Sequence, residues 1–471
     1  MKVGRPRLAL RYLTQAGGVL ALFSLTAPLL GGGSQADFIL YRILGISRSH
    51  SLVFGLLVFS IGMVGELMAG VLALSNWSQK VRTWHIVTIK TLYFLFLTVL
   101  IAASAEGFQR LIESDPTKYF MFPPNSERVF SPDQKVIHGV RPKTRFTVNH
   151  LGLRGGPPGI SDGYRILVLG GSTVECLVQD DDATWPAMLQ QLANATRPSG
   201  KIWVGNAGRS GLTSFENILQ LKHLPDMLPR LDMVIVLIGG NDLAYGYVNA
   251  GRSSPATISE QDRYDRTFFS IVRPESKFPY NLALYRLYQA VERVSNLSER
   301  GILQGAGESI SYTDWVRASR SERATAQSHL TDLPNLNQYL QIYRENLERM
   351  ANVATARNLK LVFVTQPLMY RAGQTSREEG IYGAYGKLVG YTSSGDSQFY
   401  SSLALDKMIG LYNEETLSFC NRRGLTCIEA AKKLEPVEAN YYDGMHLTDI
   451  GNKQMAHIVW DGLKSSIGVL R

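Results

Sequence analysis

The stretch RILVLGGSTVEC, residues Arg165–Cys176, decides the fold. It begins with a short apolar run, Ile166–Leu169, of the kind that forms a buried strand. Gly170 and Gly171 end the run, and glycines allow a sharp turn and the close approach of a ligand to the backbone. Ser172 follows at once, so we predict that it lies at the carboxyl end of the first strand of an α/β sheet, where such sheets bind ligands. On this stretch alone, Ser172 is either a nucleophile or the cap of the next segment.

Strand and helix patterns alternate after this stretch. We predict strands at residues 202–204, 233–238, 359–365 and 426–429, and helices at residues 184–195, 214–224, 336–357, 398–423 and from 451 to 464. The strand at 233–238 is apolar throughout, which is typical of a parallel strand covered on both faces. The alternation predicts βαβ units and a mostly parallel sheet. Residues 243–312 break the rhythm, and we interpret them as an insertion at the catalytic face, with a substrate-recognition lid as its candidate role.

The N-terminal third contains three apolar stretches, residues 16–33, 52–74 and 85–103. The last two are long enough to cross a bilayer as helices. The first resembles a signal peptide because basic residues precede it, but we favour a retained anchor, since two further spans follow and no clear cleavage site does. We therefore expect a bundle of three transmembrane helices over residues 1–103. A proline-rich connector, residues 104–164, should then pack on the catalytic domain, with residues 147–159 at the edge of the sheet.

The distribution of charge predicts the orientation of the chain in the membrane. It also argues against a nucleic-acid partner. The chain of 471 residues carries a net charge of +9. Residues 1–120 hold 11 Lys and Arg against 5 Asp and Glu, whereas the rest holds 38 against 35. Basic residues precede the first span and lie between the second and third, which predicts a cytoplasmic N-terminus and a catalytic domain outside the cytoplasm, anchored in the plasma (inner) membrane. We find no basic patch with interleaved aromatic residues, so we expect no nucleic-acid partner.

The number and spacing of the cysteines argue against a zinc site and against a disulfide scaffold. The chain has three cysteines and no CxxC motif, so we expect neither a zinc site nor a disulfide scaffold. Cys176 lies in an apolar segment and is interpreted as a small core residue. Cys420 and Cys427 are seven residues apart, and outside the cytoplasm they would be able to pair, an alternative that the sequence leaves open.

Chemically apt residues follow three of the predicted strands and stand in one late loop. These residues are Ser172, Gly208, Asn241, Asp443 and His446. A serine hydroxyl is a weak nucleophile that needs a base in contact with it, and a carboxylate fixes the tautomer of that base. The spacing of Asp443 and His446 lets the carboxylate reach one ring nitrogen and leaves the other free. The Ser172 amide, the Gly208 amide and the Asn241 side chain would stabilise an oxyanion. The simpler alternatives are that Asn241 caps a helix and that His446 is structural.

Taken together and in this order, these blocks resemble the SGNH (GDSL-type) hydrolase superfamily. The matching blocks are GGST (170–173), NAGRSG (206–211), GGND (239–242) and DGMH (443–446). The resemblance covers residues 147–465 and departs at Gly171, which stands where the GDS signature has Asp. It implies a three-layer α/β/α, flavodoxin-like domain over residues 165–471. It also implies Ser172, Asp443 and His446 as catalytic residues, an oxyanion hole of Ser172, Gly208 and Asn241, and no metal or organic cofactor.

Together with the expected membrane spans, the resemblance leads us to expect a membrane-anchored bacterial serine esterase that removes acyl groups, above all acetyl groups, from carbohydrate or related esters. One alternative is an O-acetyltransferase that modifies an extracytoplasmic polysaccharide, which would need a membrane partner protein to supply the acyl group. A second is a lipid acylhydrolase, and a third is a non-catalytic scaffold that binds polysaccharide. The sequence does not separate hydrolase from transferase, because the same residues would serve both.

Overall fold

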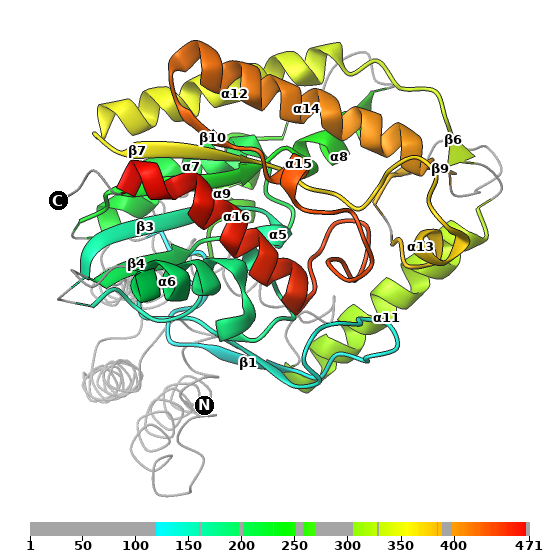
Figure 1. Cartoon of the computed structure of the whole chain (residues 1–471), viewed down its shortest axis with the longest axis horizontal. Coiled ribbons are helices and arrows are strands. Elements are labelled where there is room, and N and C mark those ends of the chain that lie inside the picture. The colour runs from blue at the N-terminus through cyan, green and yellow to red at the C-terminus, as the bar shows by residue number, and fades with distance from the viewer. Residues whose placement is uncertain are drawn as a thin grey trace, which may run out of the picture. The chain divides into compact units, whose positions relative to one another are not determined.

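A computed structural model (Figure 1) describes residues 119–159, 162–196, 201–228, 230–250, 258–269, 305–326, 329–383, 385–388 and 398–467. The three expected membrane spans, residues 104–118 of the connector and most of the expected insertion lie outside these residues. Within the part that the structure describes, no helix is both long enough and apolar enough to cross a membrane.

The central feature is a five-stranded sheet in which every pair of neighbouring strands is parallel. Its order is β10-β7-β5-β3-β4. The strands are β3 (Asp162–Gly170), β4 (Lys201–Asn206), β5 (Met233–Ile238), β7 (Lys360–Thr365) and β10 (Thr426–Ile428). All six side chains of β5 are buried, as expected for a parallel strand covered on both faces. The prediction of a mostly parallel α/β sheet is confirmed.

The order of the strands places a ligand site at the end of β3. The chain passes from β3 to β4 on one side and then returns across β3 to β5 on the other side. Open α/β sheets bind ligands at the carboxyl end of the strands where the direction of winding reverses. Ser172 follows β3 directly, so the position predicted from the sequence coincides with this switch point.

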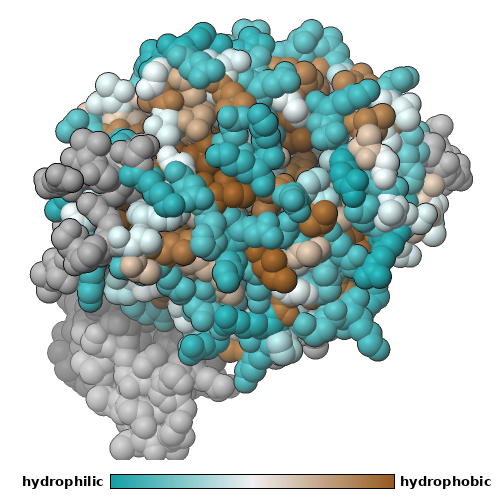
Figure 2. All heavy atoms as spheres, viewed as in Figure 1, coloured by the Kyte–Doolittle hydropathy of each residue, from teal (hydrophilic) through white to brown (hydrophobic). Residues whose placement is uncertain are grey.

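Helices cover both faces of the sheet and make three layers (Figure 1). α6 (Trp185–Thr196) packs against α16 (Asp449–Ile467), and α7 (Ser214–His223) packs against α12 (Asn337–Ala356), which also contacts α14 (Ser402–Arg423). Right-handed crossovers put α6 on one face and α7, α12 and α14 on the other. Hydrophilic side chains cover most of the face shown in Figure 2, in keeping with an apolar core enclosed between the layers.

Smaller elements frame the sheet. They are the hairpin β1 (Glu127–Phe130) and β2 (Thr144–Thr147), the three-stranded sheet β6 (His329–Leu330), β8 (Lys387–Leu388) and β9 (Gln398–Tyr400), and the helices α5 (Ser172–Glu175), α8 (Gly240–Asn249), α9 (Glu260–Thr267), α11 (Gly305–Ala324), α13 (Ser376–Gly380) and α15 (Ala430–Lys433). Arg154 forms an antiparallel bridge with Asn206 of the edge strand β4. This bridge lies within residues 147–159, the stretch expected at the edge of the sheet.

Three local expectations need correction or completion. The helix expected over 398–423 starts at Ser402, because 398–400 form β9 and the Ser401 hydroxyl caps the helix. The expected insertion begins with a regular helix, α8, and its second limit falls inside α11, which continues to Ala324. Cys420 and Cys427, left open by the sequence, form a disulfide between the end of α14 and β10.

Candidate active site

Ser172 occupies the first position of a one-turn helix, α5, directly after β3. We call residues Gly170–Cys176 the nucleophile turn. A Cβ atom on Gly170 would lie 2.8 Å from the carbonyl oxygen of Leu237, and one on Gly171 would lie 2.4 Å from Nδ2 of Asn241. The first contact is with the backbone, so the turn requires a glycine at position 170. The second contact is with the end of a side chain and shows that Asn241 packs directly against Gly171.

His446 joins the nucleophile to a carboxylate. Its Nε2 atom lies 2.8 Å from Ser172 Oγ, and its Nδ1 atom lies 2.7 Å from Asp443 Oδ2. The loop that carries the pair, Tyr441–Leu447, is called the base loop. Asp443 Oδ1 accepts hydrogen bonds from the backbone N–H groups of Met445 (2.8 Å) and His446 (2.7 Å). The structure thus brings together Ser172, His446 and Asp443, as the sequence predicted, in a continuous hydrogen-bonded relay.

The electrostatics of this pair favour a basic imidazole. Burial acts to lower the pKa of His446, but the charge and the hydrogen bond of Asp443 outweigh it, so the pKa lies above 6.5. For Asp443, burial acts to raise the pKa, and the charge and hydrogen bonds of His446 outweigh it, so the pKa lies below 3.8. Asp443 therefore stays ionised and stabilises the protonated form of His446, as a base that takes a proton from serine requires.

Asn241 lies beside the nucleophile at the start of α8. Its Nδ2 atom donates one hydrogen bond to the carbonyl oxygen of Leu212 at 2.8 Å, and a primary amide has a second hydrogen to donate. Nδ2 lies next to Gly171, the residue that precedes Ser172. Among the described residues, the Ser172 amide N–H has no acceptor. Two donors predicted from the sequence are therefore available for an oxyanion.

Gly208 does not offer the third donor that the sequence suggested. Its N–H donates to Asn206 Oδ1 at 2.9 Å, and the residue is buried. A Cβ atom on Gly208 would lie 2.2 Å from the Glu175 nitrogen, so this glycine is needed for packing against α5. Gly211, three residues later in the same block, is exposed, has a φ of +79° and has open space around it. Its N–H has no acceptor in the described part of the chain, so Gly211 is the better candidate.

Asp242 has a structural role next to Asn241. Its carboxylate accepts a hydrogen bond from the Ser214 N–H at 3.0 Å and another from the Ser214 hydroxyl. Burial raises the pKa of Asp242 to about 6. The contact ties the first turn of α8 to the first turn of α7, and it thereby fixes the helix end that presents Asn241.

A pocket opens beside the nucleophile. Its lining includes Gly171, Thr173, Leu212, Asn241, Gln366 and Met445. The Tyr442 ring lies nearly parallel to the imidazole of His446, at 11° with 5.6 Å between centroids. The Tyr442 hydroxyl lies 3.0 Å from the hydroxyl of Tyr312 on α11, and Arg320 of the same helix donates to the Tyr442 carbonyl oxygen. Sequence reasoning missed α11 as a support of the base loop, because no motif marks it.

Two other chemical features bear on the site. Within the described ranges, no group of three or more His, Cys, Asp or Glu residues is placed to hold a metal ion. Cys176 is buried, and burial raises the pKa of its thiol to about 12, so it remains protonated and serves as a core residue.

A serine–histidine–aspartate relay at the carboxyl edge of a parallel sheet is the arrangement of a serine hydrolase. The family model described as GDSL-like Lipase/Acylhydrolase matches residues 168–454, more than half of the chain. The chain therefore belongs to this family, and the prediction of an ester hydrolase enzyme is confirmed.

Solved structures of low identity resemble this chain. LAE5, an alpha/beta hydrolase enzyme from the metagenome of Lake Arreo, Spain, has 11% identity and a TM-score of 0.35, over 66% of this chain and 98% of that one. Axe2, an acetylxylan esterase from Geobacillus stearothermophilus, has 14% identity and a TM-score of 0.33, over 64% of this chain and 95% of that one. TesA has 15% identity and a TM-score of 0.33, over 64% and 98%. The comparison with curated proteins finds no match.

Proposed function

We propose that this protein is a membrane-anchored serine esterase that removes acyl groups, above all acetyl groups, from carbohydrate esters outside the cytoplasm. The observation that carries the proposal is the relay of 2.8 and 2.7 Å from Ser172 through His446 to Asp443. The acylhydrolase family supports the reaction class. The choice of a carbohydrate ester as the substrate rests on the resemblance seen in the sequence.

The first half of the reaction acylates Ser172. His446 Nε2 takes the hydroxyl proton while Ser172 Oγ attacks the ester carbonyl carbon, and the carbonyl oxygen becomes an oxyanion. The Ser172 N–H, the second Nδ2 hydrogen of Asn241 and the Gly211 N–H are the donors that we assign to it. When the intermediate collapses, the bond to the leaving oxygen breaks, and His446 returns its proton to the alcohol that departs.

The second half regenerates the enzyme. His446 removes a proton from water as the water oxygen attacks the acyl carbon, and the same donors hold the second oxyanion. Collapse breaks the bond to Ser172 Oγ, which recovers its proton from His446, and the carboxylic acid leaves. A sugar hydroxyl in place of water would make the same residues a transferase, so acceptor and water compete at this step.

Two features support a location outside the cytoplasm. The Cys420–Cys427 disulfide is typical of an oxidising compartment. The apolar stretches over residues 16–33, 52–74 and 85–103, with their flanking basic residues, favour an external C-terminal domain. Fusions of alkaline phosphatase and of a fluorescent protein to the C-terminus test this topology. An active phosphatase is expected, and a fluorescent fusion with inactive phosphatase would contradict it.

The experiment that tests the reaction uses the full chain in detergent. It measures acyl release from acetylated xylo-oligosaccharides and from p-nitrophenyl acetate, butyrate and octanoate, each with and without an unacetylated oligosaccharide. The expected result is acetate release that does not need the acceptor and is absent from Ser172→Ala. Acyl transfer to the oligosaccharide would favour the transferase, and preference for octanoate would favour a lipid acylhydrolase. No turnover and no labelling by a fluorophosphonate would favour the non-catalytic scaffold.

A further inference from the structure

Side chains from other parts of the chain hold the carbonyl groups of the nucleophile turn. The pairs are Thr173 O with Trp185 Nε1 (2.9 Å), Val174 O with Asn206 Nδ2 (2.8 Å), and Glu175 O and Cys176 O with Arg154 Nη1. The last carbonyl groups of a helix have no partner within the helix, and a helix of one turn cannot satisfy them by itself. The turn that carries Ser172 therefore depends on donors that come from outside it.

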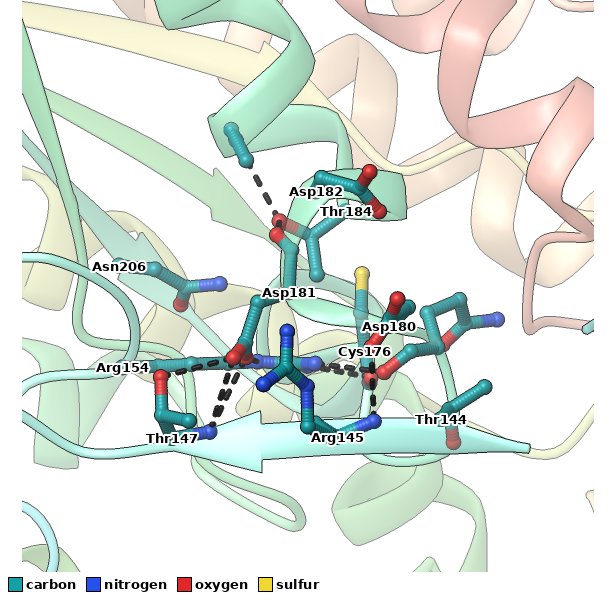
Figure 3. Close-up of polar contacts among 12 residues, drawn as sticks. Thr144, Arg145, Thr147, Arg154, Cys176, Asp180, Asp181, Asp182, Thr184 and Asn206 are labelled. Carbon is teal, nitrogen blue, oxygen red and sulfur yellow. Dashed lines mark hydrogen bonds and ion pairs between the residues drawn. The ribbon is translucent and has the colours of Figure 1, made fainter. Parts of the chain in front are cut away.

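Arg154 makes the most extensive of these contacts (Figure 3). Nη1 donates to the carbonyl oxygens of both Glu175 and Cys176, and Nη2 donates to that of Gln179 at 2.7 Å. The guanidinium also lies over the Phe146 ring, 4.3 Å from its centroid. The side chain is almost fully buried, with 1% of its surface exposed. One cation thus binds three carbonyl groups at and just beyond the end of α5.

One carboxylate lies near the guanidinium of Arg154, and it does not serve this cation alone. Asp181 lies 3.5 Å from Nε. That carboxylate is shared, because it also accepts hydrogen bonds from the Thr147 N–H (3.0 Å) and hydroxyl (2.7 Å). Burying an arginine is costly unless its donors are satisfied. Here Nη1 donates to two carbonyl groups of the nucleophile turn and Nη2 to the carbonyl group of Gln179 just beyond it, and a positive charge at the carboxyl end of a helix is favourable.

The contacts of Arg154 extend through the turn to the nucleophile. Cys176 has a left-handed backbone with a φ of +52°, and its N–H donates to the Ser172 carbonyl oxygen at 2.9 Å. A non-glycine residue in this conformation persists only where its surroundings impose it. Arg154 holds the carbonyl oxygen of this same residue. Without the guanidinium, the Cys176 carbonyl group would lose its donor. The left-handed conformation of Cys176, which ends the helical turn that begins at Ser172, would then no longer be imposed.

We propose that Arg154 is a positioning residue for the nucleophile. It fixes the position and orientation of Ser172 without touching the substrate. The inference rests on the proposed function, since it assumes that Ser172 is the nucleophile. It also gives the connector a role in catalysis, because Arg154 lies before the first strand of the catalytic sheet and bridges to the edge strand at Asn206. A displacement of about 1 Å in a reacting group can cost on the order of a hundredfold in rate.

The test compares Arg154→Lys and Arg154→Ala with a matched control, Arg145→Ala, which removes an exposed arginine from β2. We measure kcat and KM with p-nitrophenyl acetate, the rate of fluorophosphonate labelling and the thermal unfolding temperature. Arg154→Ala should lower kcat and the labelling rate by about a hundredfold, with KM changed less than about threefold. Arg154→Lys keeps the charge but cannot reach three carbonyl groups, so we expect a loss of about tenfold.

A chemical rescue separates positioning from folding. Ethylguanidine should restore part of the kcat of Arg154→Ala, whereas ethylamine at the same concentration should not, because only a guanidinium can bind several carbonyl groups in one plane. If Arg154→Ala is unfolded, Arg154→Lys supplies the kcat-to-KM comparison below its unfolding temperature. Folded Arg154 variants with wild-type kcat, or a loss that only follows the unfolded fraction, would overturn the inference. Wild-type protein that is neither active nor labelled would instead overturn the proposed function, and this inference with it.

Discussion

The two halves of the relay differ in where the contacts that orient their reacting groups come from. Within the base loop, Asp443 itself orients His446, since it accepts the N–H groups of Met445 and His446 and binds the imidazole with its other oxygen, while α11 holds the neighbouring Tyr442. The nucleophile turn is held from outside, by Arg154, Trp185 and Asn206. Chemistry that comes from a local motif is therefore visible in a sequence, whereas chemistry that depends on distant supports is not. Five changes test how far this contrast extends, and they are ordered by their expected effect on activity.

His446→Ala breaks the base loop chemically and should have the largest effect. Removal of one member of a serine relay disables most of the unit, so we expect kcat at neutral pH to fall on the order of 10⁵- to 10⁶-fold. Part of the loss should return at alkaline pH, where hydroxide assists. The measurement is kcat at pH 7 and pH 10, with Ser172→Ala as the control that shows no such recovery. A rate near wild type at pH 7 would remove His446 from the mechanism.

Asp443→Asn should lower kcat by about 10⁴-fold and shift the pH dependence. In the wild type, the carboxylate raises the pKa of His446, so the neutral base forms only above that raised value and the acidic limb of the rate profile lies above pH 6.5. In the variant, burial, which lowers the pKa of His446, is opposed only by the weaker effect of the Glu175 charge. The remaining activity should therefore have its acidic limb at lower pH. A limb at the same pH in both proteins would contradict the electrostatic role of Asp443.

Asn241→Ala removes one oxyanion donor and leaves both halves of the relay intact. We expect kcat to fall by about 10²- to 10³-fold, with fluorophosphonate labelling of Ser172 still detectable. Unlike that of His446→Ala, this loss should not respond to alkaline pH. A loss of less than about threefold would show that other donors hold the oxyanion.

Trp185→Phe removes one external support of the nucleophile turn and keeps the ring. The Thr173 carbonyl then loses its donor, so the free energy of unfolding should fall by about 1–3 kcal/mol and kcat by less than about tenfold. Trp203→Phe is the matched control, because its Nε1 donates to Gly156 at 3.0 Å, outside the turn. Urea unfolding and kcat are measured for both. Equal kcat losses in the two variants would indicate that the Trp185 contact has no special link to the nucleophile.

The Cys420→Ser, Cys427→Ser double variant lies outside both regions and should change activity least. The disulfide closes a short loop, so we expect the free energy of unfolding to fall by about 2–3 kcal/mol, with kcat unchanged. Urea unfolding of the variant is compared with that of the reduced wild type. A loss of kcat while the protein remains folded would show that the disulfide between α14 and β10 affects the geometry of the active site.

The sequence predicted the sheet, the switch point and the relay because each has a local signature. β5 is an unbroken apolar run, and Asp443 and His446 stand three residues apart. The oxyanion glycine could not be chosen in this way. The block NAGRSG has two glycines, and only burial and the Asn206 contact separate Gly208 from Gly211.

The residues that support the site could not be predicted from the sequence for the same physical reason. Arg154 stands in a turn-rich segment whose composition indicates a loop, and its partners lie 21 to 25 residues away. Tyr312 and Arg320 belong to α11, a helix that crosses the second limit of the expected insertion and has no periodic signal that points to the base loop. Such residues are recognised only by what they contact, and contacts between distant segments require the folded chain.

The separation of 274 residues between Ser172 and His446 also sets an order of events during protein synthesis. At 5 to 20 residues per second, translation of that interval takes roughly 15 to 55 s. Of the supports of the nucleophile turn, Arg154 leaves the ribosome shortly before Ser172, and Trp185 and Asn206 leave it soon after. Its base is among the last residues to be made. A nascent chain, or one truncated before Asp443, therefore contains Ser172 and these three supports but has no base to activate the serine.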